Sequence, residues 1–276
     1  MQISPWRVAP VLLRLAASLF VASGIAQAAP PPGLEPAPPD VSVEDVVDRA
    51  EDAMRGDRTY CRCEMTVSSP RLAQPRTVSF ESWSDGPGKR SFIRIHEPAK
   101  DAGTGFLKLH PNLWMYVPRV ERTVRVPPSM MLQSWMGSDF TNDDLVRESS
   151  EVDDYDHVLL GVDPGSERSG GRRSYVIEYR PHEDAPVVWG RIVAWVDAER
   201  YSPLHQEFYD EDDVEIRKLD FSDVRKVDGR WVPHLWTLTP LDKQGHRTVV
   251  RVDEVRYDLE IDEAVFTTRN LKRGRQ

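Results

Sequence analysis

The sequence predicts a mainly β protein with some α-helix, built on one large antiparallel sheet that is curved or barrel-like. Three observations predict this fold. Most of the chain after residue 75 alternates apolar and polar residues with a period of two, which is typical of strands with one buried face. Turn residues recur about every eight to twelve positions, as in Asp85-Gly86-Pro87-Gly88 and Asp228-Gly229. Helical patterns do not alternate with these strands, which argues against repeated βαβ units.

The composition is that of an acidic globular protein of one or two domains. The 276 residues include 36 Lys and Arg against 45 Asp and Glu, which gives a net charge of −9, and 39% are hydrophobic. This balance excludes a multi-span membrane protein and a chain that is disordered throughout. Excess acid argues against nucleic acid as a partner, because phosphate binding needs a basic face. Two cysteines are too few for a disulfide-stapled miniprotein or a four-thiolate zinc site.

Residues 1–28 are interpreted as a signal peptide. Arg7 and Arg14 lie in a leading segment without acids, and the apolar run from Leu15 to Ala26 is too short to cross a bilayer. Ala26-Gln27-Ala28 then offers the small-x-small pattern that a signal peptidase accepts. We therefore expect export into a periplasm.

A proline-rich leader and one helix follow. Residues 29–41 form the leader, and six prolines between positions 30 and 39 make it a stiff, extended spacer that cannot join a helix or an inner strand. Ser42 is a good helix N-cap with Asp45 three residues later. Apolar residues then recur at three- and four-residue spacing as far as Gly56, which predicts an amphipathic helix.

The predicted strands are short segments of alternating pattern, bounded by Gly, Pro or Asn. They span residues 76–83, 91–96, 106–109, 113–117, 121–126, 158–162, 174–179, 191–196, 204–209, 214–219, 231–238 and 248–257. Because no internal repeat or break in composition occurs, we predict a single domain over residues 42–276.

The segment Pro127–Phe140 interrupts the strands and is strongly apolar. Its prolines suit a first helical turn and Gly137 suits a C-terminal cap, so the pattern predicts a short helix. Met130, Met131 and Met136 lie within seven residues of one another. Methionine is flexible and suits apolar surfaces that accept variable shapes. Two compatible interpretations follow: the segment packs on the concave face of the sheet as core, or it is a lid over an apolar cavity.

No catalytic, cofactor or metal site is predicted. The sequence has no G-x-S-x-G motif, and Gly88-Lys89-Arg90-Ser91 resembles the end of a phosphate loop only superficially, because Trp83 stands where the first glycine belongs. The seven histidines are scattered. His182-Glu183-Asp184 is better explained as an exposed loop than as a metal site. A hydrolase is therefore disfavoured.

Two further features have a structural and a functional interpretation. Residues 143–156 carry seven acids, which favours a solvated face first and a docking surface for a basic partner second. Cys61 and Cys63 would lie on one face of a strand, about 6.5–7 Å apart, at the limit for a disulfide. An oxidised pair would need a bulge. Two partly buried thiols or a strained disulfide are both favoured over a redox enzyme.

One long block of sequence resembles the LolA-like outer membrane lipoprotein-sorting family. The matching stretches are Gly103-Thr104-Gly105-Phe106-Leu107, Leu113-Trp114-Met115-Tyr116-Val117-Pro118, Pro127-Pro128-Ser129-Met130-Met131, and residues 133–144 from Gln133-Ser134-Trp135 to Thr141-Asn142-Asp143-Asp144. The ending, Val265-Phe266-Thr267-Thr268-Arg269-Asn270-Leu271, is also similar. The resemblance covers about residues 42–273 and places the chain in a divergent, longer branch.

The resemblance implies an incomplete antiparallel β-barrel whose hollow face is covered by helices. In well-known members this cavity carries the acyl chains of lipoproteins across the periplasm, so the implied cargo is lipidated protein or lipid. An inner-membrane transporter is a further implied partner, and no nucleic acid is expected. Combining this fold with apolar content and alternation, we expect cargo to contact Leu113, Met115, Met130, Met131, Trp135, Met136 and Phe140.

The alternative function is an adaptor or sensor that carries no cargo. Such a protein would dock to an inner-membrane export or signalling complex through the acidic stretch. On this hypothesis Asp143, Asp144 and Glu148 form the docking surface.

Overall fold

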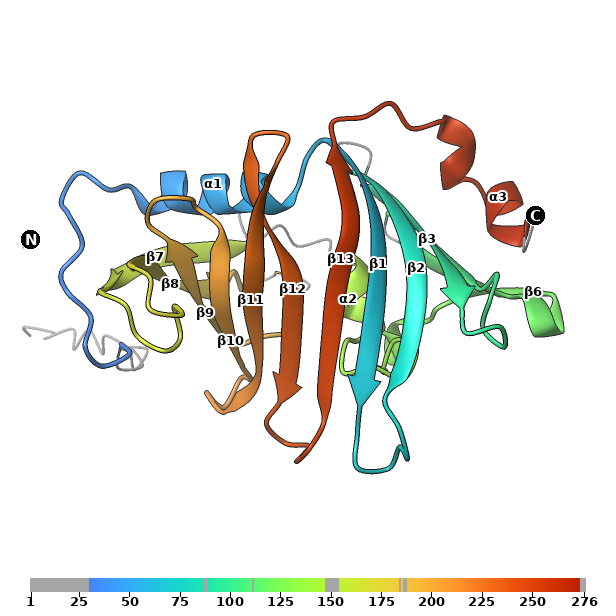
Figure 1. Ribbon diagram of the computed structural model, residues 1–276, viewed down its shortest axis with the longest axis horizontal. Coiled ribbons are helices and arrows are strands. Elements are labelled where there is room, and N and C mark those ends of the chain that lie inside the picture. Colours follow the sequence, from blue (N-terminus) through green and yellow to red (C-terminus); the bar gives the residue numbers. More distant parts are fainter. Residues whose placement is uncertain are drawn as a thin grey trace, which may run out of the picture.

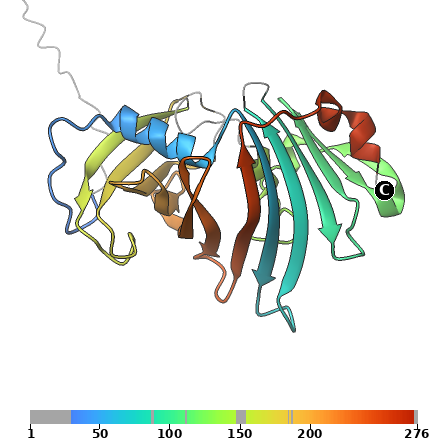
Figure 2. The ribbon, with the colours of Figure 1, turned by 45° about the horizontal axis from the view of Figure 1, so that its top comes forward.

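The computed structural model describes residues 30–86, 89–110, 112–146, 154–183, 185 and 188–273. The signal peptide predicted over residues 1–28 lies outside this part of the chain. Thirteen strands form one antiparallel sheet of order β6-β5-β4-β3-β2-β1-β13-β12-β11-β10-β9-β8-β7 (Figure 1). The sheet curls without closing (Figure 2), so its two edges are β6 and β7. The prediction of a half-open, curved antiparallel barrel is confirmed.

The helices are α1 (Val43–Met54), α2 (Asn142–Val146) and α3 (Thr268–Lys272), with 3-10 turns η1 (Pro118–Val120), η2 (Pro128–Met130) and η3 (Glu263–Phe266). The strands are β1 (Arg58–Ser68), β2 (Arg76–Asp85), β3 (Arg90–Glu97), β4 (Gly105–Leu109), β5 (Asn112–Val117), β6 (Arg122–Arg125), β7 (Tyr155–Asp163), β8 (Ser174–Pro181), β9 (Arg191–Asp197), β10 (Pro203–Tyr209), β11 (Glu215–Val227), β12 (Arg230–Pro240) and β13 (Arg247–Tyr257).

The first strand pairs with the last in the middle of the sheet. β1 was not among the strands predicted from sequence, although Cys63, Met65 and Val67 alternate along it and are buried. Its register against β13 shifts between Arg62 and Cys63. At this bulge Cys61 and Cys63 form a disulfide with their Cα atoms 6.2 Å apart. The expectation that an oxidised pair needs a bulge is therefore met.

Two segments cover the concave face, and each buries its own core. The helix α1 begins where Ser42 Oγ accepts a hydrogen bond from the Asp45 amide (3.2 Å). It packs against β12 and β7 and buries Val46 and Val47 among inward side chains of β7–β12. The segment 126–141 covers the other half, where Trp135 packs into a core of inward residues from β1–β5 and β13. The hydrophobic effect thus holds both covers against the sheet.

The prediction of a helix over Pro127–Phe140 is wrong. The chain makes only the 3-10 turn η2 and then a tight reversal, in which the Trp135 amide donates to the Phe140 carbonyl (2.7 Å). Met136 and Gly137 have φ of +49° and +73°, a left-handed pair that no α-helix accommodates. Gly137 therefore makes a turn rather than a cap, and the first α-helix after the prolines is α2.

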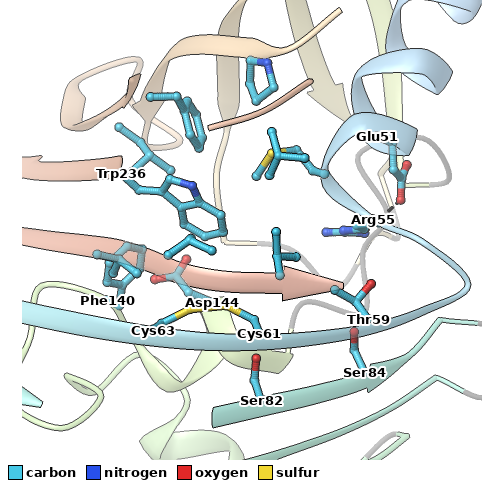
Figure 3. Close-up of a pocket in the computed structure, with 18 of the residues that line it drawn as sticks. Glu51, Arg55, Thr59, Cys61, Cys63, Ser82, Ser84, Phe140, Asp144 and Trp236 are labelled. Atoms are coloured by element: carbon cyan, nitrogen blue, oxygen red, sulfur yellow. Dashed lines mark hydrogen bonds and ion pairs between the residues drawn. A yellow bond between two sulfur atoms is a disulfide. The ribbon is translucent and has the colours of Figure 1, made fainter. Parts of the chain in front are cut away.

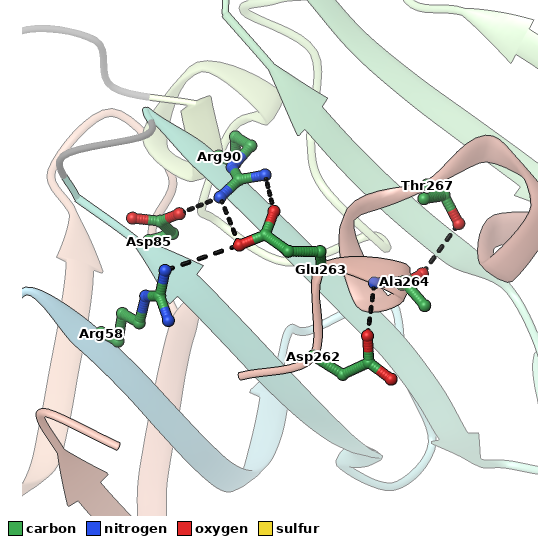
Figure 4. A network of polar contacts seen from close by, with 7 residues as sticks. All are labelled: Arg58, Asp85, Arg90, Asp262, Glu263, Ala264 and Thr267. Atoms are coloured by element: carbon green, nitrogen blue, oxygen red, sulfur yellow. Dashed lines mark hydrogen bonds and ion pairs between the residues drawn. The ribbon is translucent and has the colours of Figure 1, made fainter. Parts of the chain in front are cut away.

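The C-terminal segment packs on the convex face of β3 and β4. Phe266 and Leu271, from η3 and α3, join Phe92 and Leu107 in a separate core. A polar network fixes the same segment (Figure 4): Glu263 accepts hydrogen bonds from Arg90 (2.6 Å) and Arg58 (3.5 Å), and Arg90 also pairs with Asp85. These two carboxylates raise the pKa of Arg90, so its guanidinium stays protonated.

The proline-rich leader is more than a spacer. Glu35 makes two backbone hydrogen bonds with Val162 at the edge strand β7 (2.8 and 2.9 Å), and Leu34 packs on the convex core of β8–β10. The leader can pair here because β7 is an edge with free backbone groups. The prediction that prolines keep it out of an inner strand holds, since it only touches the edge.

Gly161→Ala is expected to release the leader. Gly161 has a φ of +151°, and an added Cβ would lie 2.6 Å from the Glu35 carbonyl oxygen. Limited proteolysis should cut residues 30–41 faster than in the wild type. Gly170→Ala is the matched control, because Gly170 also has a positive φ (+60°) but open space at its Cβ. Equal protection of the leader in both variants would contradict this role of Gly161.

Candidate functional site

A cavity of about 440 Å³ lies between the concave face of the sheet and its two covering segments (Figure 3). Its wall comes from both halves of the sheet, from α1, and from Trp135 and Phe140 of the 126–141 segment. Small-molecule sites are usually concave and apolar, and this volume is within their range. The cavity is therefore the candidate site.

Apolar side chains make most of the cavity wall. Inward positions of β11–β13 supply Phe221, Trp236 and Val252. Phe221 and Trp236 meet edge to face with ring centroids 5.9 Å apart. The Trp236 indole is fixed by donating to the Pro233 carbonyl (2.9 Å). This wall suits a ligand that is itself apolar, because contact with it removes hydrocarbon from water.

One buried ion pair ties the cover, by which we mean the 126–141 segment together with α2, to the sheet. Asp144 on α2 accepts two parallel hydrogen bonds from Arg217 on β11 (2.7 and 2.8 Å), with side chains 9% and 5% exposed. The guanidinium also lies over the rings of Trp189 and Phe208, 4.3 and 4.5 Å from their centroids. Bidentate geometry and aromatic stacking fix its orientation. The pair therefore anchors α2 to the half of the sheet that α1 covers.

Further contacts anchor the cover to the centre of the sheet. The Asp139 amide donates to Thr248 Oγ1 on β13 (3.0 Å), and that hydroxyl donates to the Asp139 carboxylate (2.8 Å). Arg76 on β2 donates to the Met136 carbonyl. Trp135 meets Phe80 of β2 edge to face at 5.4 Å. The cover thus spans both halves of the sheet.

The end of the cavity near the C-terminus of α1 is polar. Thr59, Ser82, Ser84 and Ser91 line it, as does an ion pair in which Arg55 donates to Glu51 (2.9 Å). The Arg55 side chain is 52% exposed, so the cavity reaches solvent here. In Figure 3, Thr59 and Ser84 lie beside each other near Arg55, and the disulfide lies farther along the wall.

Tyr257 lines the cavity opposite Thr59 across the pairing of β13 with β1. Burial raises the pKa of this phenol to about 12. Tyr257 is therefore uncharged at neutral pH.

Two of the seven predicted cargo contacts line the cavity: Trp135 and Phe140. Leu113 is buried in the core behind them, and Met115, Met131 and Met136 pack against that core without reaching the cavity wall. Met130 is 36% exposed and is not among the side chains packed against that core. For Met130, Met131, Trp135, Met136 and Phe140, the reversal at Met136 and Gly137 directs the side chains differently from a helix.

Two of the three residues predicted to form an acidic docking surface, Asp143 and Asp144, lie among the described residues. Asp144 turns inward to Arg217 and lines the cavity, so it is not a free surface acid. A buried guanidinium attracts a carboxylate more strongly than water-exposed partners do. Asp143 is partly buried, and its amide donates to the Met131 carbonyl (2.9 Å). Glu148 lies outside the described residues.

Sequence reasoning missed the contribution of α1 and of β1–β3 to the cavity. Val47, Ala50 and Met54 lie on the apolar stripe of α1, which the sequence showed but did not connect to the site. The hydroxyl residues of β1–β3 could not be recognised as cavity lining from sequence, because serine and threonine are common at strand positions of every kind. The described residues contain no helix long and apolar enough to cross a membrane, and no cluster of three potential metal-ligating side chains.

Solved structures show the same fold. A DUF1329 family protein from Desulfovibrio piger is 27% identical, with 83% of this chain and 97% of that chain covered and a TM-score of 0.73. A putative outer membrane lipoprotein-sorting protein domain from Vibrio parahaemolyticus is 23% identical over 83% and 98%, with a TM-score of 0.70. A LolA superfamily protein from Nitrosomonas europaea is 19% identical over 83% and 99%, with a TM-score of 0.69. The resemblance to LolA-like lipoprotein-sorting proteins is confirmed at the level of the fold.

A family model described as "Uncharacterized protein" matches residues 88–273. The sequence matches no curated protein. The matched region begins near β3 and includes the cover, β4–β13 and the C-terminal segment.

Removing one partner of the Asp144–Arg217 pair is expected to destabilise the fold strongly. Arg217→Met or Asp144→Leu should each lower the free energy of unfolding by about 3–5 kcal/mol, because a buried charge loses its partner. The double variant should be more stable than the sum of the two losses predicts. Urea unfolding of all four proteins measures this coupling. Simply additive losses would show that the pair does not hold the cover.

Proposed function

The chain belongs to the protein family whose model matches residues 88–273, and we propose that it carries acyl chains in its cavity. The cargo is lipidated protein or lipid, which the carrier takes across the periplasm towards the outer membrane. Export by a signal peptide over residues 1–28 is part of this proposal. So is a single carrier domain over residues 42–276, preceded by the leader 29–41.

The single observation that supports this proposal best is the apolar cavity inside a sheet of LolA fold. Burying hydrocarbon is worth about 0.8 kcal/mol per CH₂ group, so a palmitoyl-length chain gains on the order of 10 kcal/mol. A chain that crosses an aqueous compartment needs such shielding throughout. No bond has to be made or broken, so the proposed function is not enzymatic.

We propose that Trp135 and Phe140 contact the cargo directly. Both line the cavity and both belong to the cover. The core behind Trp135 would then supply flexible packing that lets this side chain adjust to acyl chains of different shape. It contains Leu113, Met115, Met131 and Met136. Met130, which is exposed, would meet cargo only when the cover opens.

Cargo transfer requires the cover to move. The 126–146 segment is held to the sheet by the buried Trp135, by the Asp144–Arg217 pair and by the Asp139–Thr248 contacts, all of which must separate when it opens. An acceptor that binds the open form better than the closed form would shift the equilibrium towards release. In this proposal an inner-membrane transporter loads the carrier, as the resemblance to accessories of export systems implies.

A charge in the cavity is expected to abolish cargo binding. Val255 lines the cavity and is partly buried, so Val255→Glu should lower acyl-chain binding at least tenfold, since the carboxylate must stay hydrated. Val120→Glu, at a 56% exposed position outside the cavity, is the matched control. Native mass spectrometry of protein purified from its own cells, with organic extraction, measures copurified lipid.

Two results would contradict the carrier function. One is wild-type protein that is empty and takes up no labelled lipopeptide, which would favour the adaptor function. The other is equal lipid retention in Val255→Glu and Val120→Glu, which would place the lipid outside the cavity.

A further inference from the structure

The polarity of the cavity wall changes in one direction along three adjacent strands. Inward positions are apolar at the end covered by Trp135 and carry hydroxyls at the end near Arg55. In that order they are Met65, Cys63, Cys61 and Thr59 on β1, Val78, Phe80, Ser82 and Ser84 on β2, and Ile95, Ile93 and Ser91 on β3. The cavity is therefore amphipathic along its length.

The hydroxyl residues form one continuous row across the strands. Ser84 is the register partner of both Thr59 on β1 and Ser91 on β3, and Ser82 is the partner of Cys61. Register partners have Cβ atoms about 4.5–5.5 Å apart, so a single polar group can reach two of them. Ser82, Ser84 and Ser91 donate no hydrogen bond to any described residue. Their hydrogen-bonding capacity is available to a ligand.

The charges in the described lining are already neutralised by one another. The four charged lining residues form two pairs, Glu51 with Arg55 and Asp144 with Arg217. No guanidinium or ammonium remains among them to balance a phosphate. Since an ion buried without a counter-charge is costly, this lining disfavours an anionic group at the serine row, inside the mouth at which Arg55 meets solvent.

We propose that the cavity selects uncharged acyl esters and amides, with the ester or amide carbonyl bound by the serine row. The acyl chain lies towards Trp135 and Phe140, and the rest of the molecule leaves the cavity past Arg55. This inference rests on the proposed carrier function and specifies its ligand. It fits a lipidated protein, because such cargo joins its acyl chains through esters or amides and must keep its polypeptide in water. It does not fit a lipid whose phosphate would have to lie inside the cavity, beside the serine row.

The test compares three probes with identical chains. Dioctanoylglycerol has ester carbonyls, dioctylglycerol ether has none, and dioctanoyl phosphatidic acid adds a phosphate. We expect the wild type to bind the ester about tenfold more tightly than the ether, since each hydrogen bond lost weakens binding several-fold. Phosphatidic acid should bind more weakly than the neutral ester. Displacement of a fluorescent fatty acid measures all three.

The variant Ser82→Ala/Ser84→Ala/Ser91→Ala should lose most of the preference for ester over ether, because Thr59 alone of the hydroxyl row remains. Ser79→Ala/Ser222→Ala, which removes hydroxyls outside the cavity lining, should keep the wild-type preference. Equal wild-type binding of ester and ether, or tighter binding of phosphatidic acid, overturns the selectivity and leaves the carrier function standing. Failure of the wild type to bind any probe overturns both.

Discussion

The pairing of β1 with β13 is the constraint on which the rest of the structure depends. It joins a half made of β1–β6 to a half made of β7–β13, although the two strands stand at opposite ends of the sheet-forming chain. Without it the concave face would split, and Val252 on β13 would no longer share a wall with Cys63 on β1. The cavity exists because this long-range pairing makes one curved surface from two meanders.

A curved sheet that does not close must cover its apolar concave face by other means. Here α1 covers one half and the 126–141 segment the other, and each brings its own hydrophobic core. The space between two separate covers remains unfilled, because neither can reach across the full width of the curve. A hollow interior is thus a consequence of covering a wide sheet with two short segments. The leader and the C-terminal segment protect the convex face at the two ends of the sheet.

The sequence predicted the sheet well because period-two alternation is a local signal. It predicted α1 for the same reason, from Ser42 and a regular apolar stripe. The cover was correctly predicted to be apolar, but it was predicted as a helix and is instead a turn. The left-handed φ at Met136 is set by tertiary packing and not by residue type. The cavity wall was largely missed, because residues as distant as Thr59 and Ser91 become neighbours only through strand register.

The cover is held by two kinds of contact, apolar packing around Trp135 and the buried Asp144–Arg217 pair, and the two respond differently to opening. An apolar anchor exposes hydrocarbon to water when it separates, so its opening cost grows with the area exposed. The Asp144–Arg217 pair behaves differently: its attraction is lost on opening, but both ions recover the hydration that burial took from them. Removing one partner is costly, whereas separating two intact partners into water is much less so. The ion pair therefore fixes the position of the closed cover, while the main cost of opening lies in exposing Trp135 and its apolar neighbours to water.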